Sequence, residues 1–371
     1  MIRLLTVIGA RPQIIKAAAI SRAVKNSFSD KIEERILHTG QHYDANMSQV
    51  FFDELDIPAP HYNLGVGSSS HGEQTAKMID GIESVLRSEH FDGIILYGDT
   101  NSTLAGAVAA AKMQVPVFHI EAGLRSFNMT MPEEQNRIVC DHLSSILFAP
   151  TQIAIRNLEG EGLTSSKALF CGGKGRLVIN SGDVMYDNAL FFSKLAQKKS
   201  TIFKDCRIEP RDFILATVHR DFNTDNPDRI GSIFRALSEI ADIEGIAVVL
   251  PLHPRTRKYL PDNLSKRIIV IPPASFFDIL VLEKNAKVIM TDSGGVQKEA
   301  FFFGRPCVIL RPETEWVEIL DHNAGILADA DYDRIIQSYK RMKDNDVVFP
   351  PLFGDGNAAL KILRSIWEYI N

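Results

Sequence analysis

Acidic side chains gather in one segment of the chain, residues 98–137, which reads GDTNST…HIEAGLRSFNMTMPEEQNR. They are Asp99, Glu121, Glu133 and Glu134. Carboxylates that converge raise one another's pKa, which leaves one group able to donate a proton and another able to accept one. The segment therefore predicts proton transfer to and from carbon or oxygen. For the two adjacent glutamates, capping of the helix that they begin is an equal alternative.

A second segment, TDSGGVQKEA at residues 291–300, joins a predicted strand to a predicted helix. Free N–H groups and the helix dipole make such an N-terminus a site for phosphate. Gly294 and Gly295 would let the ligand approach closely, and Glu299 could accept hydrogen bonds from a sugar or ribose hydroxyl. The alternative is an ordinary glycine turn with Ser293 as the helix N-cap.

Cations follow two other predicted strands. In GARPQIIK, residues 9–16, Arg11 and Lys16 bracket a helix start and could hold an anionic group. This segment is neither a Walker A loop nor the GxGxxG fingerprint of nicotinamide and flavin proteins. In ATVHRDFN, His219 and Arg220 end a strand and could serve a phosphate or its leaving oxygen.

The remaining candidate ligands carry weaker signals. His253 ends the next strand, in LPLHPRTRK. Asp329 and Asp331 resemble a metal-binding DxD, but they lie in an acidic, polar run that is typical of a solvated loop. No set of His, Cys and carboxylate side chains has the spacing of a metal site, so we expect no metal and no cofactor.

Short aliphatic runs precede these polar residues and alternate with segments of helical period, the pattern of α/β domains with doubly wound parallel sheets. Ligands of such sheets lie beyond the carboxyl ends of the strands, where the candidate side chains stand. The predicted strands are residues 4–8, 34–39, 93–97, 117–120 and 146–149, then 213–218, 247–251, 268–271, 288–291 and 307–310. Helices are expected at residues 13–25, 103–112, 227–240, 295–303 and 357–370.

The length of 371 residues favours two domains. A Gly-rich stretch at residues 169–187 is the expected crossing between them. We predict an N-terminal Rossmann-like domain at residues 1–175, a C-terminal one at 176–356, and a last helix at 357–371 that could pack on either, including back on the first.

The composition excludes several classes of protein. The net charge of -5 offers no overall field for nucleic acid or an anionic membrane. The four cysteines are widely scattered, which argues against a disulfide framework or a zinc ribbon. No apolar run approaches the roughly 20 residues that cross a bilayer. We expect a cytoplasmic protein with neither nucleic acid nor membrane as a partner.

Seven motifs together resemble one family, the non-hydrolysing UDP-N-acetylglucosamine 2-epimerases. They occur in the family's order over nearly the whole chain: GARPQIIK, HTGQHYD, GDTNST, HIEAGLRS, MPEEQNR, VHR and DSGGVQKEA. The resemblance implies a GT-B arrangement, in which two Rossmann-like domains face each other across a cleft, a homodimer, and a UDP-sugar substrate.

The resemblance also implies a reaction that needs neither NAD nor metal. A base takes the C2 proton of the sugar as the C1–O bond to UDP breaks. The resulting 2-acetamidoglycal is protonated from the other face, and UDP returns. The product would supply surface polysaccharide.

The family's site residues carry over in two sets. The catalytic set comprises Asp99, Glu121, Glu133 and His219, with no assignment of carboxylates to sugar faces. The set that binds the UDP-sugar comprises Arg11, Lys16, Arg137, Ser293, Gly294, Gly295 and Glu299, with His253 as a weaker match on the uridine side. Glu299 is expected on the ribose hydroxyls.

Three departures from the family pattern leave the sugar and the activation by a second UDP-sugar open. Phe222 replaces an acidic residue, Trp316 replaces an arginine, and Glu73 replaces the arginine of an Arg–Gln–Thr triplet found in activated members. The chain also resembles a branch that acts on UDP-2,3-diacetamido-2,3-dideoxyglucuronate. UDP-N-acetylglucosamine and this uronate are therefore competing substrates.

A uronate carries a carboxylate at C6, which is costly to desolvate without a cation. Arg255, Arg257 and Arg311 are the candidates, and at least one is expected to bind it. Alternatively, these arginines are solvated or grip the diphosphate.

Two other functions fit the phosphate-binding residues. A retaining glycosyltransferase of the same fold would use the SGG segment but would not need Asp99, Glu121 and Glu133 together. A non-catalytic regulator that binds UDP-sugars would keep Arg11 and Glu299 and tolerate loss of the carboxylates.

Overall fold

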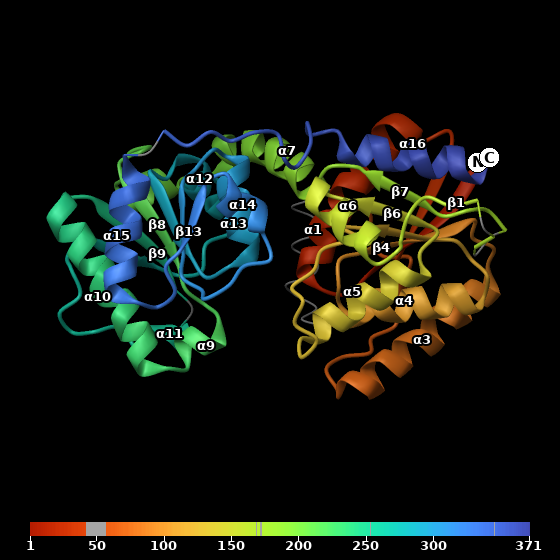
Figure 1. Ribbon diagram of the computed structural model, residues 1–371, viewed down its shortest axis with the longest axis horizontal. Helices are drawn as coiled ribbons and strands as arrows, with labels where there is room; N and C mark the ends of the chain where they lie inside the picture. Colours follow the sequence, from red (N-terminus) through yellow and green to blue (C-terminus); the bar gives the residue numbers. More distant parts are fainter. Residues whose placement is uncertain (42–56, 168, 171–172, 253, 345) are drawn as a thin grey trace. The chain divides into compact units, whose positions relative to one another are not determined.

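The computed structural model describes residues 1–41, 57–167, 169–170, 173–252, 254–344 and 346–371. It contains two compact units (Figure 1): unit 1 comprises Met1–Asn188 with Leu352–Asn371, and unit 2 comprises Ala189–Pro351. Each unit is built around a parallel sheet with helices on its faces. The predicted fold class, two Rossmann-like α/β domains of the GT-B type, is confirmed.

Unit 1 contains a seven-stranded parallel sheet in the order β3-β2-β1-β4-β5-β6-β7. Its central strands are buried aliphatic runs, as expected of parallel strands that are covered on both faces. The strands are β1 (Ile2–Ile8), β2 (Ile32–His38), β3 (Tyr62–Asn63), β4 (Gly93–Tyr97), β5 (Val117–Ile120), β6 (Ile146–Ala149) and β7 (Leu177–Asn180). The strand order reverses between β1 and β4, which is where doubly wound sheets bind ligands.

Helices cover both faces of this sheet, with α1 and α16 on one face and α3, α4 and α5 on the other (Figure 1). The helices are α1 (Arg11–Ala23), α3 (His71–Ser88), α4 (Asn101–Lys112), α5 (Pro132–Leu143), α6 (Gln152–Gly160) and α16 (Ala358–Ile370), and the π-helix η1 (Val24–Phe28) continues α1. Small residues let α4 pack closely on the sheet, because a Cβ atom on Gly106 would lie 2.5 Å from Leu96 Cδ2. In the first turn of α4, the Thr103 hydroxyl donates to the Tyr97 carbonyl oxygen at 2.8 Å, which holds this turn beside the end of β4.

Unit 2 contains a six-stranded parallel sheet in the order β10-β9-β8-β11-β12-β13. The strands are β8 (Phe213–Thr217), β9 (Ala247–Pro251), β10 (Ile268–Ile271), β11 (Val288–Thr291), β12 (Cys307–Ile309) and β13 (Gly325–Leu327). The order reverses between β8 and β11, so the His219 and Ser293 loops leave neighbouring strand ends.

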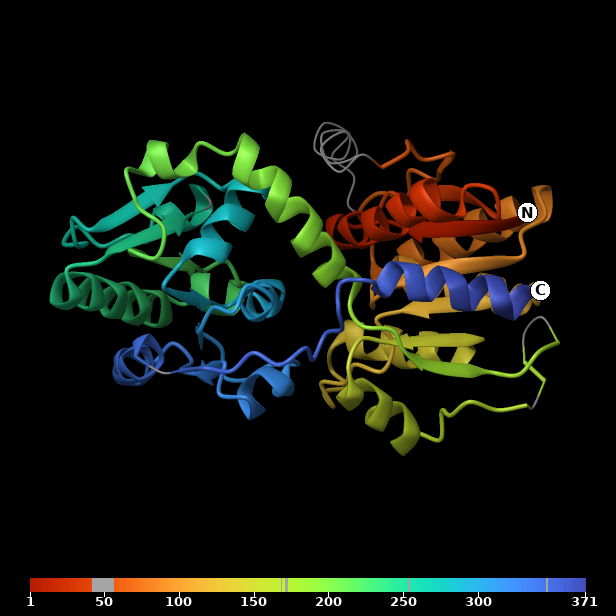
Figure 2. The same ribbon diagram turned by 90° about the horizontal axis from the view of Figure 1, so that it is seen from above.

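On one face of this sheet α10 and α15 pack side by side (Figure 2) and bury Phe234, Leu237 and Tyr339 against the strands. The helices of the unit are α8 (Ile202–Cys206), α9 (Asp221–Thr224), α10 (Pro227–Glu244), α11 (Pro254–Arg257), α12 (Phe276–Asn285), α13 (Gly294–Phe302), α14 (Val317–Asp321) and α15 (Tyr332–Lys343). The chain passes from unit 1 to unit 2 within α7 (Val184–Lys199).

All ten predicted strands are present, and six of them have the predicted bounds. Three further strands, β3, β7 and β13, lie at sheet edges and were not predicted. They are short and partly exposed, so they lack the long buried aliphatic run that marks a central strand.

The segment expected to cross between domains, residues 169–187, instead contains β7, which pairs with β6. Unit 1 therefore extends to Asn188 instead of ending at residue 175. Helix α16 also belongs to unit 1, where its first N–H groups, from Ala358 and Ala359, donate to the carboxylate of Asp187 at 3.1 and 2.8 Å. No helix of the described ranges is long and apolar enough to cross a membrane.

Candidate active site

The turn after β4 presents Asp99 at the carboxyl end of the sheet of unit 1. Arg137 of α5 makes an ion pair with Asp99 and donates to Glu134 Oε2 at 2.6 Å. The Arg137 side chain is 9% exposed, whereas that of Asp99 is 31% exposed. Asn136 fixes the turn by donating to the Asp99 carbonyl oxygen at 2.9 Å. The Asp99 carboxylate is thus held by a buried cation and is still accessible.

Glu121 follows β5 in the left-handed backbone region, with φ of 71°. Few residues other than glycine adopt this conformation, and it concentrates at functional sites. The Glu121 carboxylate makes an ion pair with Lys16 of α1, and the two side chains are only 10% and 13% exposed. A Cβ atom on Gly98 would lie 3.1 Å from both Glu121 Oε2 and Lys16 Nζ. The turn that carries Asp99 therefore meets the Glu121–Lys16 pair.

The two glutamates that begin α5 have different environments. Glu134 is buried and accepts N–H hydrogen bonds from Ser126 at 3.0 Å and Phe127 at 2.9 Å. Burial alone would raise the pKa of Glu134, but these hydrogen bonds and the charge of Arg137 hold it below its ordinary value. Glu134 thus fixes the preceding loop and does not cap its own helix.

Glu133 is exposed in the first turn of α5. Among the described residues, no hydrogen bond or ion pair joins it to Asp99 or Glu121. Its predicted catalytic role stays a prediction.

The GARPQIIK segment forms the turn into α1, with Arg11 exposed as the first helical residue. Gln13, an additional residue of this site, holds this turn in place. Its side chain accepts from Gly9 N at 2.8 Å and donates to Tyr97 O and Thr103 Oγ1, both at 3.0 Å. One buried amide therefore ties the turn before α1 to the end of β4 and the start of α4.

In unit 2, His219 follows β8 and is oriented by Asp292, which follows β11. The His219 Nδ1 atom lies 3.1 Å from Asp292 Oδ1, and the His219 side chain is 54% exposed while that of Asp292 is fully buried. Asp292 also accepts the backbone N–H groups of His219 and Arg220 and the side-chain amide of Asn223, at 3.0–3.1 Å. Burial would raise the pKa of Asp292, but His219 and these donors lower it, so the carboxylate stays ionised.

The phosphate-site prediction falls at the N-terminus of α13. Ser293 is its N-cap and accepts the Val296 N–H at 3.4 Å, so the capping alternative also holds. A Cβ atom on Gly294 would lie 2.2 Å from Glu315 Oε1, whereas one on Gly295 would meet only Ser293 Oγ, at 3.8 Å. Gly294 thus permits close packing, whereas Gly295 has space around it at the helix end.

Glu299, in the second turn of α13, lies beside the buried Glu283 of α12. Burial and the charge of Glu299 raise the pKa of Glu283 well above its ordinary value. Both causes favour the protonated form of Glu283.

Arg311, after β12, is 11% exposed and lies 3.1 Å from Glu315 through Nη1 and Oε2. It lines a pocket of about 380 Å³ in unit 2 together with Phe222, Arg229, Pro312 and Glu313. Arg220 and Arg257 are exposed. His253 and the side chain of Arg255 lie outside the described residues.

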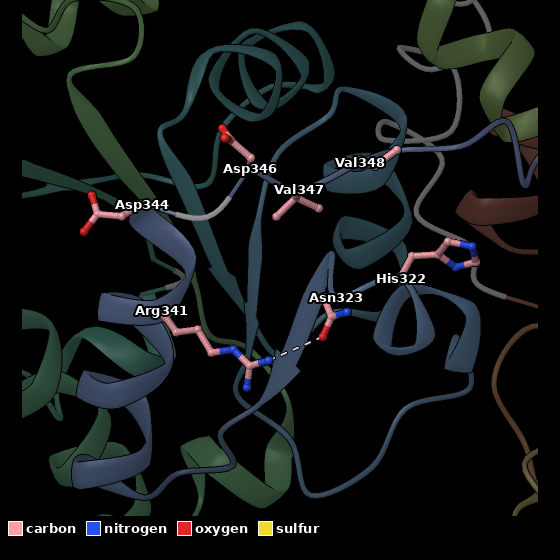
Figure 3. A pocket seen from close by; sticks show the side chains of 7 residues that line it. All are labelled: His322, Asn323, Arg341, Asp344, Asp346, Val347 and Val348. Atoms are coloured by element: carbon pink, nitrogen blue, oxygen red, sulfur yellow. Dashed lines mark hydrogen bonds between the residues drawn. The ribbon is translucent and has the colours of Figure 1, made fainter.

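A second pocket, of about 460 Å³, lies at the amino-terminal end of β13 in unit 2 (Figure 3). His219 and Ser293, in contrast, follow the carboxyl ends of their strands. Asn323 stands just before β13, and Arg341, in the last turn of α15, donates to its Oδ1 atom at 3.4 Å. The lining residues are His322, Asn323, Arg341, Asp344, Asp346, Val347 and Val348. None of the predicted site residues lines it.

The DxD aspartates have structural partners. Asp329 makes an ion pair with Arg229, and Asp331 caps α15 by accepting the Arg334 N–H at 2.8 Å. In the part of the chain that the structure describes, no three His, Cys, Asp or Glu side chains could hold a metal ion together.

Comparisons with known proteins decide the family. The family model described as UDP-N-acetylglucosamine 2-epimerase matches residues 25–367. The chain is 46% identical to the UDP-2,3-diacetamido-2,3-dideoxy-D-glucuronate 2-epimerase of Pseudomonas aeruginosa, over 97% of this chain and 98% of that one. The chain belongs to the UDP-N-acetylglucosamine 2-epimerase family.

A solved structure supports the same family. The crystal structure of the Methanocaldococcus jannaschii UDP-GlcNAc 2-epimerase in complex with UDP-GlcNAc and UDP is 39% identical, covers 98% of this chain and 99% of its own, and has a TM-score of 0.83. The prediction of an isomerase that epimerises C2 of a UDP-sugar is confirmed, and the glycosyltransferase alternative is not favoured.

Proposed function

We propose that Asp99 and Glu121 transfer the protons of this epimerase, with Arg137 and Lys16 stabilising their charge. The observation that supports this role is that the Gly98–Asp99 turn meets the Glu121–Lys16 pair at the carboxyl end of one sheet. A base removes the proton from C2 as the C1–O bond to UDP breaks, which gives a 2-acetamidoglycal and UDP. An acid then protonates C2 from the opposite face, and the diphosphate oxygen returns to C1. Glu133 remains a third candidate on the same helix as Arg137.

His219 and the α13 N-terminus would stabilise the departing diphosphate. The ionised Asp292 favours the proton on His219 Nδ1 and directs that edge of the ring inward. The doubly protonated ring can then donate its Nε2 proton to the leaving oxygen, which leaves the neutral ring with its proton on Nδ1, and the ring takes the proton back when UDP returns. The N–H of Gly295 and the dipole of α13 add positive potential, and Glu299 is proposed on the ribose hydroxyls.

For the sugar, we favour the 2,3-diacetamido uronate over UDP-N-acetylglucosamine. Its C6 carboxylate needs a cation, and Arg311 is a largely buried arginine that lines a pocket beside the β12 end. The relative at 46% identity carries the name of an epimerase for this sugar.

The family resemblance supports a proposal for the oligomeric state, the compartment and the use of the product. We propose a homodimer in the cytoplasm whose product is a precursor of surface polysaccharide. Sedimentation of the purified chain tests the oligomeric state.

One experiment separates the three candidate functions. Each UDP-sugar is incubated with the protein in deuterated water without an acceptor, and the C2 position is followed by NMR. Deuterium at C2 of both epimers is expected. Binding without exchange would identify a regulator, and turnover only with an added acceptor would identify a glycosyltransferase.

A further inference from the structure

A fully buried ion pair lies behind the two turns that carry Asp99 and Glu121. His119 of β5 and Asp141 of α5 are both inaccessible to solvent, and His119 Nδ1 lies 2.7 Å from Asp141 Oδ1. The HIEAGLRS motif contains this histidine, but the proposed reaction gives it no role. The pair does not reach solvent, so it cannot contact substrate.

Both ring nitrogens of His119 face oxygen acceptors. The Nε2 atom lies 2.8 Å from the Gly98 carbonyl oxygen, opposite the contact of Nδ1 with Asp141. A neutral imidazole has one N–H, so donation to the Gly98 carbonyl and to an ionised Asp141 together requires the doubly protonated ring. Burial alone would lower the pKa of His119, but Cys140 and Asp141 raise it well above its ordinary value. The two contacts and the direction of this pKa shift both favour the imidazolium form.

Asp141 stays ionised for the complementary reason. Burial would raise its pKa, but His119 and Arg125 lower it. Arg125 Nη1 lies 2.8 Å from Asp141 Oδ2, and its Nε atom donates to Glu161 at 2.6 Å. The buried charges thus alternate in sign, which offsets part of their desolvation cost.

The ion pair holds both reactive turns by their backbone. His119 donates to the carbonyl oxygen of Gly98, the residue before Asp99. Asp141 Oδ2 accepts the N–H of Gly123, two residues after Glu121, at 3.1 Å. Both glycines have positive φ, of 61° and 81°, so these turns depend on fixed and unusual backbone geometry.

We propose that His119 and Asp141 are positioning residues for the epimerisation, whose contacts with Gly98 and Gly123 set the separation of the Asp99 and Glu121 carboxylates. This inference rests on the proposed roles of those two carboxylates. Proton transfer on two faces of one carbon needs both groups at fixed distances from it, and a displacement of about 1 Å can cost about 10²-fold in rate.

Two substitutions at His119 test the proposal. His119→Gln keeps an N–H donor that can reach Gly98 O, whereas His119→Leu keeps the volume and removes the donor. We expect kcat to fall about 10²-fold in the Leu variant and about tenfold in the Gln variant, with KM within about threefold and UDP affinity unchanged. Thermal unfolding gives the folded fraction, and kcat is expressed per folded molecule.

Asp187→Asn is the matched control, because Asp187 is a buried carboxylate of the same unit that contacts α16 and neither reactive turn. It is expected to change stability and leave kcat unchanged. Equal kcat losses in the Gln and Leu variants, or wild-type kcat in the Leu variant, would overturn the proposal. Asp99→Asn and Glu121→Gln are measured in parallel: if these variants stay active, it is the proposed proton transfer that fails.

Discussion

Glu121 occupies a backbone conformation that costs about 1–3 kcal/mol for a residue other than glycine. Two hydrogen bonds stabilise this strained conformation: the N–H groups of Glu121 and Ala122 both donate to Phe148 O at 3.1 Å. The resulting turn directs the carboxylate to Lys16 and against Gly98. A capping or solvent-facing glutamate would not need this geometry, so the strain itself favours a catalytic role.

The first prediction concerns the two carboxylates. Glu121→Gln and Asp99→Asn should abolish epimerisation, because an amide cannot take up the C2 proton. UDP affinity should stay within about tenfold, or about 1.4 kcal/mol, since the proposed diphosphate site lies in unit 2. Deuterium exchange at C2 and calorimetric titration with UDP measure the two effects. A parallel loss of UDP binding would contradict the assignment.

The second prediction concerns His219. His219→Ala should slow turnover by about 10²-fold or more, as expected when a positioned proton donor to the leaving group is lost. His322→Ala is the control, because His322 lies before the amino-terminal end of β13, whereas His219 follows the carboxyl end of β8. Steady-state kcat is the measurement, and near-normal turnover would reduce His219 to a structural residue.

At the scale of elements, the N-terminus of α13 is capped by a side chain and is also the proposed site of the diphosphate. Ser293 caps the helix, whereas the second helical residue, Gly295, is exposed and has room for a side chain. These two roles can be separated by substitution. A side chain that improves the helix should also obstruct the proposed phosphate.

Gly295→Asp provides this separation. An acidic residue in the first turn stabilises a helix by about 0.3–1 kcal/mol, and replacing glycine within a helix adds to this gain. The same carboxylate would repel a diphosphate. We therefore expect an unchanged or higher Tm together with a loss of UDP affinity of about tenfold or more. Gly231→Asp, on α10, is the control for added charge. Unchanged UDP affinity would mean that the diphosphate binds elsewhere.

The attachment of α16 to unit 1 predicts a pH dependence of stability. Burial, followed by the nearby charge of Asp183, raises the pKa of Asp187 to about 6, against an ordinary value of 3.8. Between these values the folded state binds more protons than the unfolded state, so this group's contribution to stability falls as pH rises. Chemical denaturation between about pH 4 and pH 7 should show this slope in the wild type. A slope that persists in Asp187→Asn would contradict the assignment.

The sequence predicted central elements better than edge elements. Runs such as Gly93–Tyr97 and Val288–Thr291 are buried on both faces, so composition alone marks them. The edge strand β7 has half-buried residues within a Gly-rich stretch, and its strand character depends on pairing with β6. That dependence on a distant partner explains why the expected end of the first domain came before β7.

At the scale of the whole molecule, the two units divide the chemistry between them. Unit 1 carries the proposed proton-transfer groups, and unit 2 carries the proposed diphosphate site. Residue type and strand-end position marked Asp99, Glu121 and His219 as candidates in the sequence, and the family resemblance implied their catalytic roles. Their positioning partners could not be selected in the same way, because Asp292 lies 73 residues from His219 and Asp141 lies 22 residues from His119. The neighbouring strands β8 and β11 bring the first pair together, and the packing of α5 against β5 brings the second pair together.

The preference for one sugar over the other depends on whether a cation lies where the C6 carboxylate of the uronate would bind. Arg311 is 11% exposed beside a pocket and lies close to Glu315, whereas Arg257 is exposed on the short helix α11. Desolvating a uronate without a partner would be costly, so Arg311 is the stronger of the two candidates. Trp316, which is buried in the next segment, would shape the adjacent wall.

The wild type should therefore turn over the UDP-2,3-diacetamido uronate with a higher kcat/KM than UDP-N-acetylglucosamine. Arg311→Ala should lower kcat/KM for the uronate at least about tenfold more than for the neutral sugar, because about 1.4 kcal/mol of a charged contact is lost with one substrate only. Arg257→Ala is the control and should affect both substrates equally and little. A wild-type preference for UDP-N-acetylglucosamine would refute the proposed substrate. Equal losses on both sugars in Arg311→Ala would instead place this arginine on the diphosphate, which the two substrates share.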